Sequence, residues 1–128
     1  MSEEWLRPVR CYVSPAGNNK VEDWYRALLP QERAYADEFI KSMRKTREWT
    51  LPHYRLRLRG YKGLGELRWH SGKKQHRLIG YLKGETFFAV MGCTHKGSVY
   101  DPHDALDTAE QRKSQIERGE VKTVEYDL

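Results

Sequence analysis

The sequence predicts a single α+β domain, of element order β-α-α-β-β-β-α, that covers residues 1–128. Two neighbouring segments near the N-terminus have apolar residues at helical spacing, three extended segments with short turns follow, and a clearly delimited helix comes last. A chain of 128 residues is long enough to bury an ordinary core. We therefore expect an antiparallel meander sheet with a helical hairpin on one face and a C-terminal helix.

The first strand and the helical hairpin are predicted from the N-terminal third. Residues 9–14 are rich in β-forming residues and are followed by a Pro-Ala-Gly turn, which favours a strand. Asn19 is a suitable N-cap for a first helix, and Pro30 suits the first turn of a second helix. The apolar stripes expected on these helices are Val21, Trp24, Tyr25 and Leu28 on the first, and Tyr35, Phe39, Ile40 and Met43 on the second.

The central sheet is predicted from extended segments at residues 64–70, 75–82 and 85–93, joined by turns at residues 71–74 and 83–84. A four-residue loop at residues 71–74 sets Arg68 opposite Arg77. Successive strand residues alternate between faces, so one face should be apolar and meet the helices. This apolar face comprises Leu67, Trp69, Leu78, Leu82, Phe87, Ala89 and Met91, and the opposite face comprises Glu66, Arg68, His70, Arg77, Ile79 and Tyr81.

The C-terminal helix is predicted from its end signals. Asp101 is expected as its N-cap, Pro102 at its first position, and Gly119 just beyond its end. Its apolar stripe is thin, and the tail at residues 121–128 is expected either to add an edge strand or to be frayed. The stripe consists of Ala105, Leu106, Ala109 and Ile116.

Charge is distributed unevenly along the chain. Residues 41–83 hold 13 Lys/Arg against two acids, a balance of +11, whereas residues 101–128 hold four Lys/Arg against eight acids, a balance of −4. A one-sided basic block indicates a polyanionic partner such as nucleic acid; a solvated basic face without a ligand is the alternative. The residues expected to bind RNA are Arg55, Arg57, Arg59, Lys62, Lys73 and Lys74.

The cysteine content and the hydropathy indicate a cytoplasmic protein. Cys11 and Cys93 both lie in apolar, strand-like contexts, which favours reduced core thiols. No apolar run approaches the length of a membrane span, and the first ten residues lack the apolar stretch of a secretory signal. We therefore expect no membrane contact.

Two groups of residues form a predicted catalytic site. Arg68 and Arg77, directly opposed across a strand pair, repel each other unless Glu66 offsets the charge or an anion fills the gap. Arginine suits an anion because its planar fork donates two hydrogen bonds to a phosphate. An exposed basic strand face without a function is the alternative.

The second group lies in the segment that follows the last strand of the meander. It carries His95, Lys96 and Tyr100 between a strand end and a helix start, where loops commonly carry chemistry, although an ordinary surface loop is the alternative. Metal-independent RNA cleavage needs a base for the 2′-hydroxyl, an acid for the leaving 5′-oxygen and cations on the phosphoryl oxygens. These three residues complete the predicted catalytic set with Arg68 and Arg77, with no metal and no other cofactor.

Residues 63–112 contain a series of short motif positions, namely Leu64, Glu66, Leu67, Arg68, Arg77, Lys96, Ala109 and Arg112. In their order and spacing these positions resemble the phage-derived, HigB-like branch of the RelE/ParE/HigB toxin superfamily. The upstream order of strand, helical hairpin and basic linker agrees with that branch as well.

The resemblance implies ribosome-associated mRNA cleavage by 2′-hydroxyl attack, which leaves a cyclic phosphate. It also implies neutralisation by a co-encoded helix-turn-helix antitoxin, the toxin being a monomer or bound in that complex. On this resemblance Arg68 and Arg77 contact the scissile phosphate, Lys96 is a basic loop residue, and Tyr100 matches a functional tyrosine near the last helix. Gly97 departs from the family pattern, which more often has paired lysines here.

Two alternatives to the nuclease stay open. One is a toxin like those of the ParE branch, which bind DNA gyrase and have no nuclease chemistry. The other is a non-catalytic, basic RNA-binding protein of phage origin, which the departure at Gly97 would suit.

Overall fold

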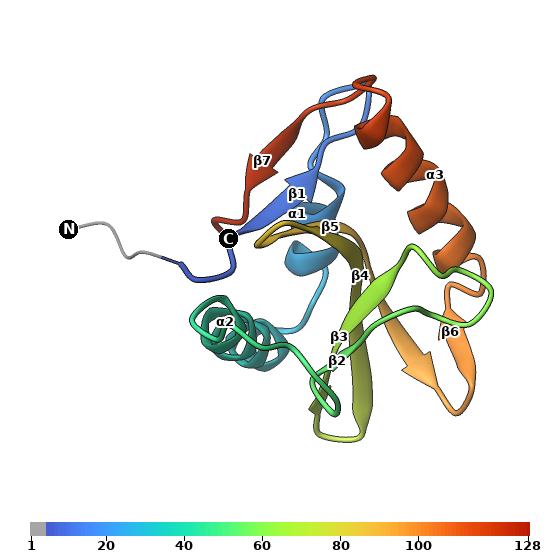
Figure 1. Cartoon of the computed structure of the whole chain (residues 1–128). Coiled ribbons are helices and arrows are strands. Elements are labelled where there is room, and N and C mark those ends of the chain that lie inside the picture. The colour runs from blue at the N-terminus through green and yellow to red at the C-terminus, as the bar shows by residue number, and fades with distance from the viewer. Residues whose placement is uncertain (1–4) are drawn as a thin grey trace.

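The structure, a computed structural model, describes residues 5–128 and confirms the α+β class (Figure 1). Residues 1–4, part of the segment in which no secretory signal is expected, lie outside the described residues. The elements are β1 (Val9–Tyr12), α1 (Lys20–Arg26), α2 (Pro30–Arg44), β2 (Tyr54–Arg55), β3 (Gly65–Ser71), β4 (Lys74–Lys83), β5 (Thr86–Lys96), β6 (Val99–Asp101), α3 (Ala105–Glu117) and β7 (Thr123–Glu125).

Within this part of the chain the strands form one sheet of order β2-β3-β4-β5-β1-β7, and β6 pairs with the end of β5. The predicted antiparallel meander is present as β3, β4 and β5. β1 adds to β5 in parallel, and β7 pairs antiparallel with β1 at the sheet edge. The sheet is therefore mixed, and the C-terminal tail supplies an edge strand.

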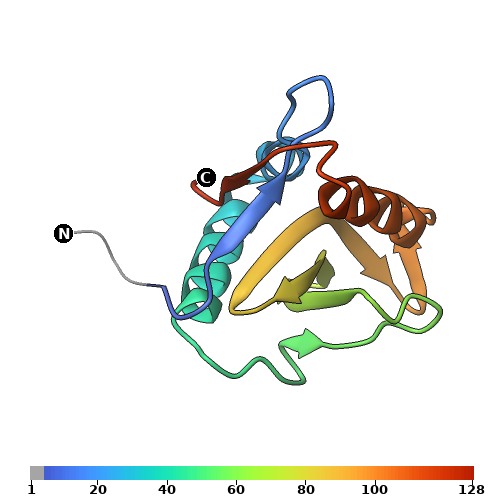
Figure 2. The same cartoon turned by 45° about the horizontal axis from the view of Figure 1, so that its top comes forward.

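Helices cover both faces of the sheet, as Figures 1 and 2 show from two directions. Residues of α1 and α2 share one core with the apolar face of the meander, and residues of α3 share a second core with Ile79 and Tyr81 on the opposite face. The helical hairpin thus packs on one face, as predicted. The opposite face is polar only where α3 does not cover it.

One residue of the predicted apolar face lies on the other side of the sheet. Met91 belongs to the second core, with α3, whereas Phe87 and Ala89 belong to the first. The reason is a β-bulge: Gly80 pairs with Ala89 and Ile79 pairs with Met91, so Val90 is an extra residue. One extra residue shifts the alternation of all residues that follow it.

The two helices of the hairpin begin where the sequence predicts. The Asn19 side chain accepts a hydrogen bond from the first turn of α1, and Pro30 opens α2. The predicted stripe of α2 is wrong at Tyr35, which is 59% exposed, because the buried face is rotated to Ala36, Ile40 and Met43. These three residues follow the i, i+4, i+7 spacing of one helix face.

The start of α3 also differs from the prediction. Asp101 is not its N-cap, because it is the last residue of β6 and pairs with Thr94, and the helix begins at Ala105 after Asp104. Gly119 lies just beyond the helix end with a φ of +70°, as predicted for a C-terminal glycine. Arg112 attaches α3 to the sheet by donating a 2.8 Å hydrogen bond to the carbonyl of the bulge residue, Val90.

Both cysteines are free and buried, as expected for core thiols. Burial raises the pKa of Cys11 and of Cys93 to about 12, so neither thiol forms the reactive thiolate near neutral pH. Among residues 5–128, no helix is long and apolar enough to cross a membrane.

Candidate active site

The predicted register of the central hairpin is confirmed: Arg68 pairs with Arg77 across β3 and β4. The turn is shorter than predicted, because Ser71 already pairs with Lys74 and only residues 72 and 73 lie between the strands. Gly72, with a φ of +61°, adopts the left-handed conformation that such two-residue turns require. The shorter turn leaves the register unchanged.

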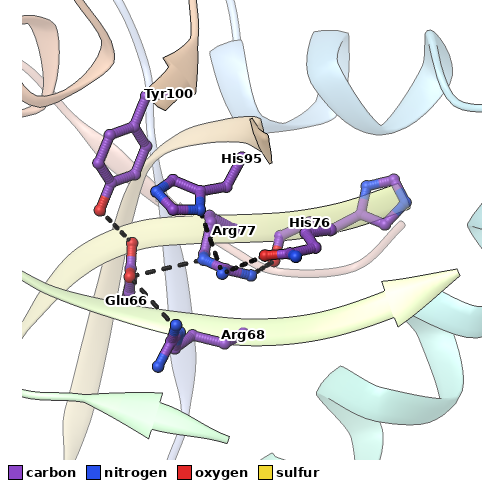
Figure 3. Close-up of polar contacts among 7 residues, drawn as sticks. Glu66, Arg68, His76, Arg77, His95 and Tyr100 are labelled. Atoms are coloured by element: carbon purple, nitrogen blue, oxygen red, sulfur yellow. Dashed lines mark hydrogen bonds and ion pairs between the residues drawn. The ribbon is translucent and has the colours of Figure 1, made fainter. Parts of the chain in front are cut away.

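Glu66 lies between the two arginines. Its Oε1 is 3.6 Å from Nε of Arg68 and 3.5 Å from Nε of Arg77, and its side chain is only 4% exposed (Figure 3). Its other oxygen, Oε2, accepts a 2.7 Å hydrogen bond from the hydroxyl of Tyr100. The repulsion between the arginines is therefore offset by the carboxylate of Glu66, and no bound anion is needed between them.

The two arginines differ in their access to solvent. The side chain of Arg68 is 26% exposed, whereas that of Arg77 is 3% exposed. Arg77 Nη1 donates to the backbone carbonyl of His76 and Nη2 donates to Oε1 of Gln75, both at 2.9 Å. Arg77 is thus held by protein groups, and of the two only Arg68 has a guanidinium that a ligand can reach from outside.

The sequence predicts an irregular loop at His95, Lys96 and Tyr100, but in the structure these residues lie in two paired strands. β5 continues through Lys96, and β6 returns antiparallel to it after a turn at Gly97 and Ser98. Gly97 has a φ of +62°, so the residue that departs from the family pattern is the one that the tight turn requires. His95 pairs with Tyr100, and their rings meet edge to face with centroids 4.7 Å apart.

Burial and neighbouring charges keep His95 and Tyr100 uncharged near neutral pH. Burial, and next the Arg77 guanidinium, lower the pKa of His95, although Glu66 acts in the opposite direction. Burial and the hydrogen bond to Glu66 raise the pKa of Tyr100 above its usual value of 10. Tyr100 therefore keeps its hydroxyl proton, which it donates to Glu66.

A cleft of about 780 Å³ opens beside this cluster, between the β3–β4 turn and the β5–β6 hairpin. Three of the predicted basic residues lie at the cleft: Lys73 and Lys74 at the first hairpin and Lys96 at the second. Lys74 also forms an ion pair of 3.1 Å with Glu32 of α2. The residues that line the cleft are 73–75, 94–96, 99–101 and 103.

The other predicted RNA-binding residues lie away from the cleft. Arg55 is in β2 opposite Glu66, so it shares the face of the sheet that carries Arg68. Arg57, Arg59 and Lys62 are exposed in the segment between β2 and β3. The structure thus divides the predicted basic set into a group at the cleft and a group at the β2 edge.

Several polar residues at the site were not among those predicted for it, notably Gln75, Asp101 and His103. Gln75 lies two residues before Arg77 on the same strand face, a relationship that the predicted register already contained. Asp101 and His103 line the cleft because β6 folds back on β5 at the two-residue turn of Gly97 and Ser98, and this Gly-Ser pair is the local signal that could have indicated the hairpin. Among residues 5–128, no group of three or more His, Cys, Asp or Glu side chains is arranged to hold a metal ion.

Comparisons with protein-family models, with curated proteins and with solved structures found no match to this chain. The likeness to the RelE/ParE/HigB toxins therefore stays a hypothesis based on short motifs.

Proposed function

We propose that this protein is an endoribonuclease that cleaves RNA by attack of a 2′-hydroxyl on the adjacent phosphate, without a metal ion. More specifically, we propose a cytoplasmic toxin of a type II toxin–antitoxin system, which cleaves mRNA on the ribosome and is neutralised by a helix-turn-helix antitoxin. The observation that carries the proposal is the joining of Glu66, Arg68, Arg77, His95 and Tyr100 in one cluster beside a lysine-bearing cleft.

Burial divides the cluster into residues that can touch RNA and residues that support them. Arg68, His95 and Tyr100 are partly exposed, whereas Glu66 and Arg77 are buried behind them. Arg68 does not itself line the cleft, but it is the arginine of the cluster that a phosphoryl oxygen can reach, and Lys96 adds positive charge at the cleft. Arg77 balances the charge of Glu66 and orients it.

The hydrogen bond from Tyr100 to Glu66 offers a path for the proton of the attacking hydroxyl. The 2′-hydroxyl transfers its proton to the Tyr100 oxygen while Tyr100 passes its own proton to Glu66. The 2′-oxygen then forms a bond to phosphorus, the bond from phosphorus to the 5′-oxygen breaks, and that oxygen takes a proton from water. Glu66 returns its proton through Tyr100 to the hydroxide that this leaves, which restores the site. The products are a 2′,3′-cyclic phosphate and a 5′-hydroxyl.

This arrangement favours a nuclease over the two alternatives. A gyrase-binding toxin needs a docking surface but has no use for a tyrosine that donates to a buried carboxylate between two arginines. A non-catalytic RNA-binding protein needs the lysines of the cleft but not this cluster.

The test is cleavage by the purified full-length protein of a single-stranded RNA and of an mRNA under translation on ribosomes. We expect cleavage in at least one assay, with cyclic phosphate ends that disappear when the scissile nucleotide carries a 2′-deoxyribose. Arg68→Gln should reduce the rate by about 100-fold, because one cation on the phosphoryl oxygens is lost. Arg26→Gln is the matched control, because Arg26 is an exposed residue of α1 on the other face of the sheet. This variant should cleave like the wild type.

Other results would contradict the proposal. RNA binding without cleavage in either assay would indicate a non-catalytic RNA-binding protein. Inhibition of gyrase supercoiling with intact mRNA would indicate the gyrase-binding alternative. Products with 3′-hydroxyl ends would exclude attack by the 2′-hydroxyl.

A further inference from the structure

The guanidinium of Arg77 faces one ring nitrogen of His95. Arg77 Nη2 lies 3.5 Å from Nδ1 of His95 (Figure 3). A guanidinium carries N–H donors only and stays charged in proteins. The contact is therefore favourable only when Nδ1 bears a lone pair, because a proton on Nδ1 would point at another N–H group.

Arg77 is not free to turn away from His95. Its Nη1 is held by the His76 carbonyl and its Nη2 by Gln75, both at 2.9 Å, and its Nε is 3.5 Å from Glu66. The side chain is also 3% exposed, so water does not replace these partners. The donor that faces His95 is consequently a fixed feature of the site.

His95 is held from its other side as well. Its ring packs edge to face on Tyr100, which is itself bonded to Glu66. The second ring nitrogen, Nε2, points away from Arg77 on the Tyr100 side of the ring (Figure 3). His95 lines the cleft, and because Nδ1 faces Arg77, Nε2 is the ring nitrogen that is left for a ligand.

We propose that Arg77 is a positioning residue that holds His95 as a neutral imidazole with its proton on Nε2. His95 then offers a hydrogen-bond donor to the cleft and has no free lone pair there. The consequence for catalysis rests on the proposed nuclease function. In that reaction His95 donates to a phosphoryl oxygen and does not accept the proton of the 2′-hydroxyl, which leaves that role to Tyr100 and Glu66.

The charges around His95 agree with a neutral ring. The groups that act on it are Arg77 and Arg68, which disfavour a further positive charge, and Glu66, which favours one. Burial is the largest effect and acts in the same direction as the arginines, so the net result lowers the pKa of His95. Tyr100 carries no charge near neutral pH, because its pKa is raised.

The test is the tautomer of His95, measured in the full chain without RNA. Protein labelled with ¹⁵N at histidine gives two-bond proton–nitrogen correlations that distinguish the two neutral tautomers and the imidazolium. The His95 signals are assigned by their loss in His95→Gln. We expect the wild type at pH 7 to show a protonated Nε2 and an unprotonated Nδ1. A proton on Nδ1, in either the other tautomer or the imidazolium, would overturn the proposal.

Substitutions at Gln75 and Arg77 test whether Arg77 sets the tautomer of His95. Gln75→Leu removes the acceptor that orients Nη2 while keeping the buried ion pair, so the other tautomer should become detectable. Exposed Lys83→Gln, at the far end of the same strand, is the control and should leave the His95 spectrum unchanged. An unchanged spectrum in both Gln75→Leu and Arg77→Lys would show that Arg77 does not set the tautomer.

The role in cleavage is tested separately, so that the two proposals can fail independently. Glutamine has an N–H group near the position of Nε2 but does not titrate in this range. His95→Gln should therefore lose no more than about tenfold in rate, whereas His95→Leu should lose about 100-fold. Equal losses of about 100-fold in both variants would show that His95 transfers a proton. If the protein cleaves no RNA at all, the spectrum still decides the tautomer.

Discussion

The hydroxyl of Tyr100 donates a 2.7 Å hydrogen bond to Oε2 of Glu66, and this bond joins the short strand β6 to the buried face of β3. β6 has three residues and otherwise pairs only with the end of β5, in the part of the chain that the structure describes. The bond therefore anchors one wall of the cleft to the core. The same bond supplies the proton path of the proposed reaction, so its removal should affect both stability and activity.

Tyr100→Phe removes that bond and leaves Glu66 with one donor fewer. A hydrogen bond to a charged, buried group contributes about 1.5–3 kcal/mol, so the free energy of unfolding should fall by about 2 kcal/mol in urea titrations. RNA cleavage should fall by about 100-fold. Tyr61→Phe removes an exposed hydroxyl that bonds Asp107 and is the matched control. A loss of stability without any loss of cleavage would rule out the proton path through Tyr100.

Arg77→Met should destabilise the protein strongly, because it leaves the carboxylate of Glu66 buried without its fully buried partner. Removal of one member of a buried ion pair costs roughly 3–5 kcal/mol. Arg68→Met, at the more exposed partner of the same carboxylate, should cost about 1 kcal/mol. Urea unfolding of the two variants measures the difference. Equal costs would mean that burial does not distinguish the two arginines.

Binding of RNA should depend on salt through the lysines of the cleft. Each phosphate neutralised on a single strand contributes about 0.7 to the slope of log K against log salt. Lys73→Gln and Lys96→Gln should each reduce the slope by about that amount, measured by fluorescence anisotropy with a 2′-O-methyl oligonucleotide that resists cleavage. Lys41→Gln, exposed on α2, is the control. Unchanged slopes for both cleft lysines would show that RNA does not bind there.

Stability should decrease as the pH falls from about 7 toward 5. His76 is 1% exposed, it stacks on Trp69, and burial lowers its pKa below the usual 6.5 although Glu32 opposes this. The unfolded chain therefore takes up a proton at a higher pH than the folded protein does. The contribution of neutral His76 to the free energy of unfolding is complete above about pH 6.5, and it decreases as the pH falls through the pKa of His76 in the folded protein.

His95, whose pKa is also lowered, acts in the same direction. His76→Phe keeps the aromatic stack and should make the curve shallower between pH 5 and 7 in urea titrations, with exposed His103→Asn as the matched variant. The pKa of Glu32 is lowered chiefly by its backbone hydrogen bond. Its titration therefore changes the stability only below about pH 4.5 and not between pH 7 and 5. A wild-type stability that stays constant from pH 7 to 5 would contradict this account.

Local patterns were sufficient to predict the central hairpin and the ends of several elements. A turn centred between residues 72 and 73 sets Arg68 opposite Arg77, and the observed turn, two residues shorter than expected, keeps the same centre and therefore the same pairing. Asn19, Pro30 and Gly119 mark helix ends through backbone chemistry that acts within a few residues. Such features depend only on neighbours along the chain, so the sequence reveals them.

The features that make the site depend on residues far apart in the sequence. The bulge at Val90 is stabilised by Arg112 of α3, and it moves Met91 to the other face of the sheet. The hydrogen bond between Tyr100 and Glu66 joins residues that are 34 positions apart, and it holds the β5–β6 hairpin against β3. The periodicities of helices and strands relate residues only a few positions apart, so they do not reveal these long-range contacts.

The sequence by itself thus determined the α+β class, the register of the two arginines and the concentration of basic charge around them. Only the tertiary structure decided that Arg77 is buried, with both Nη groups hydrogen-bonded to protein, while Arg68 stays accessible. The physical reason is that alternation assigns a residue to a face of the sheet, whereas its exposure depends on what packs over that face. Here Glu66, Gln75, His95 and Tyr100 converge on Arg77 from four different strands.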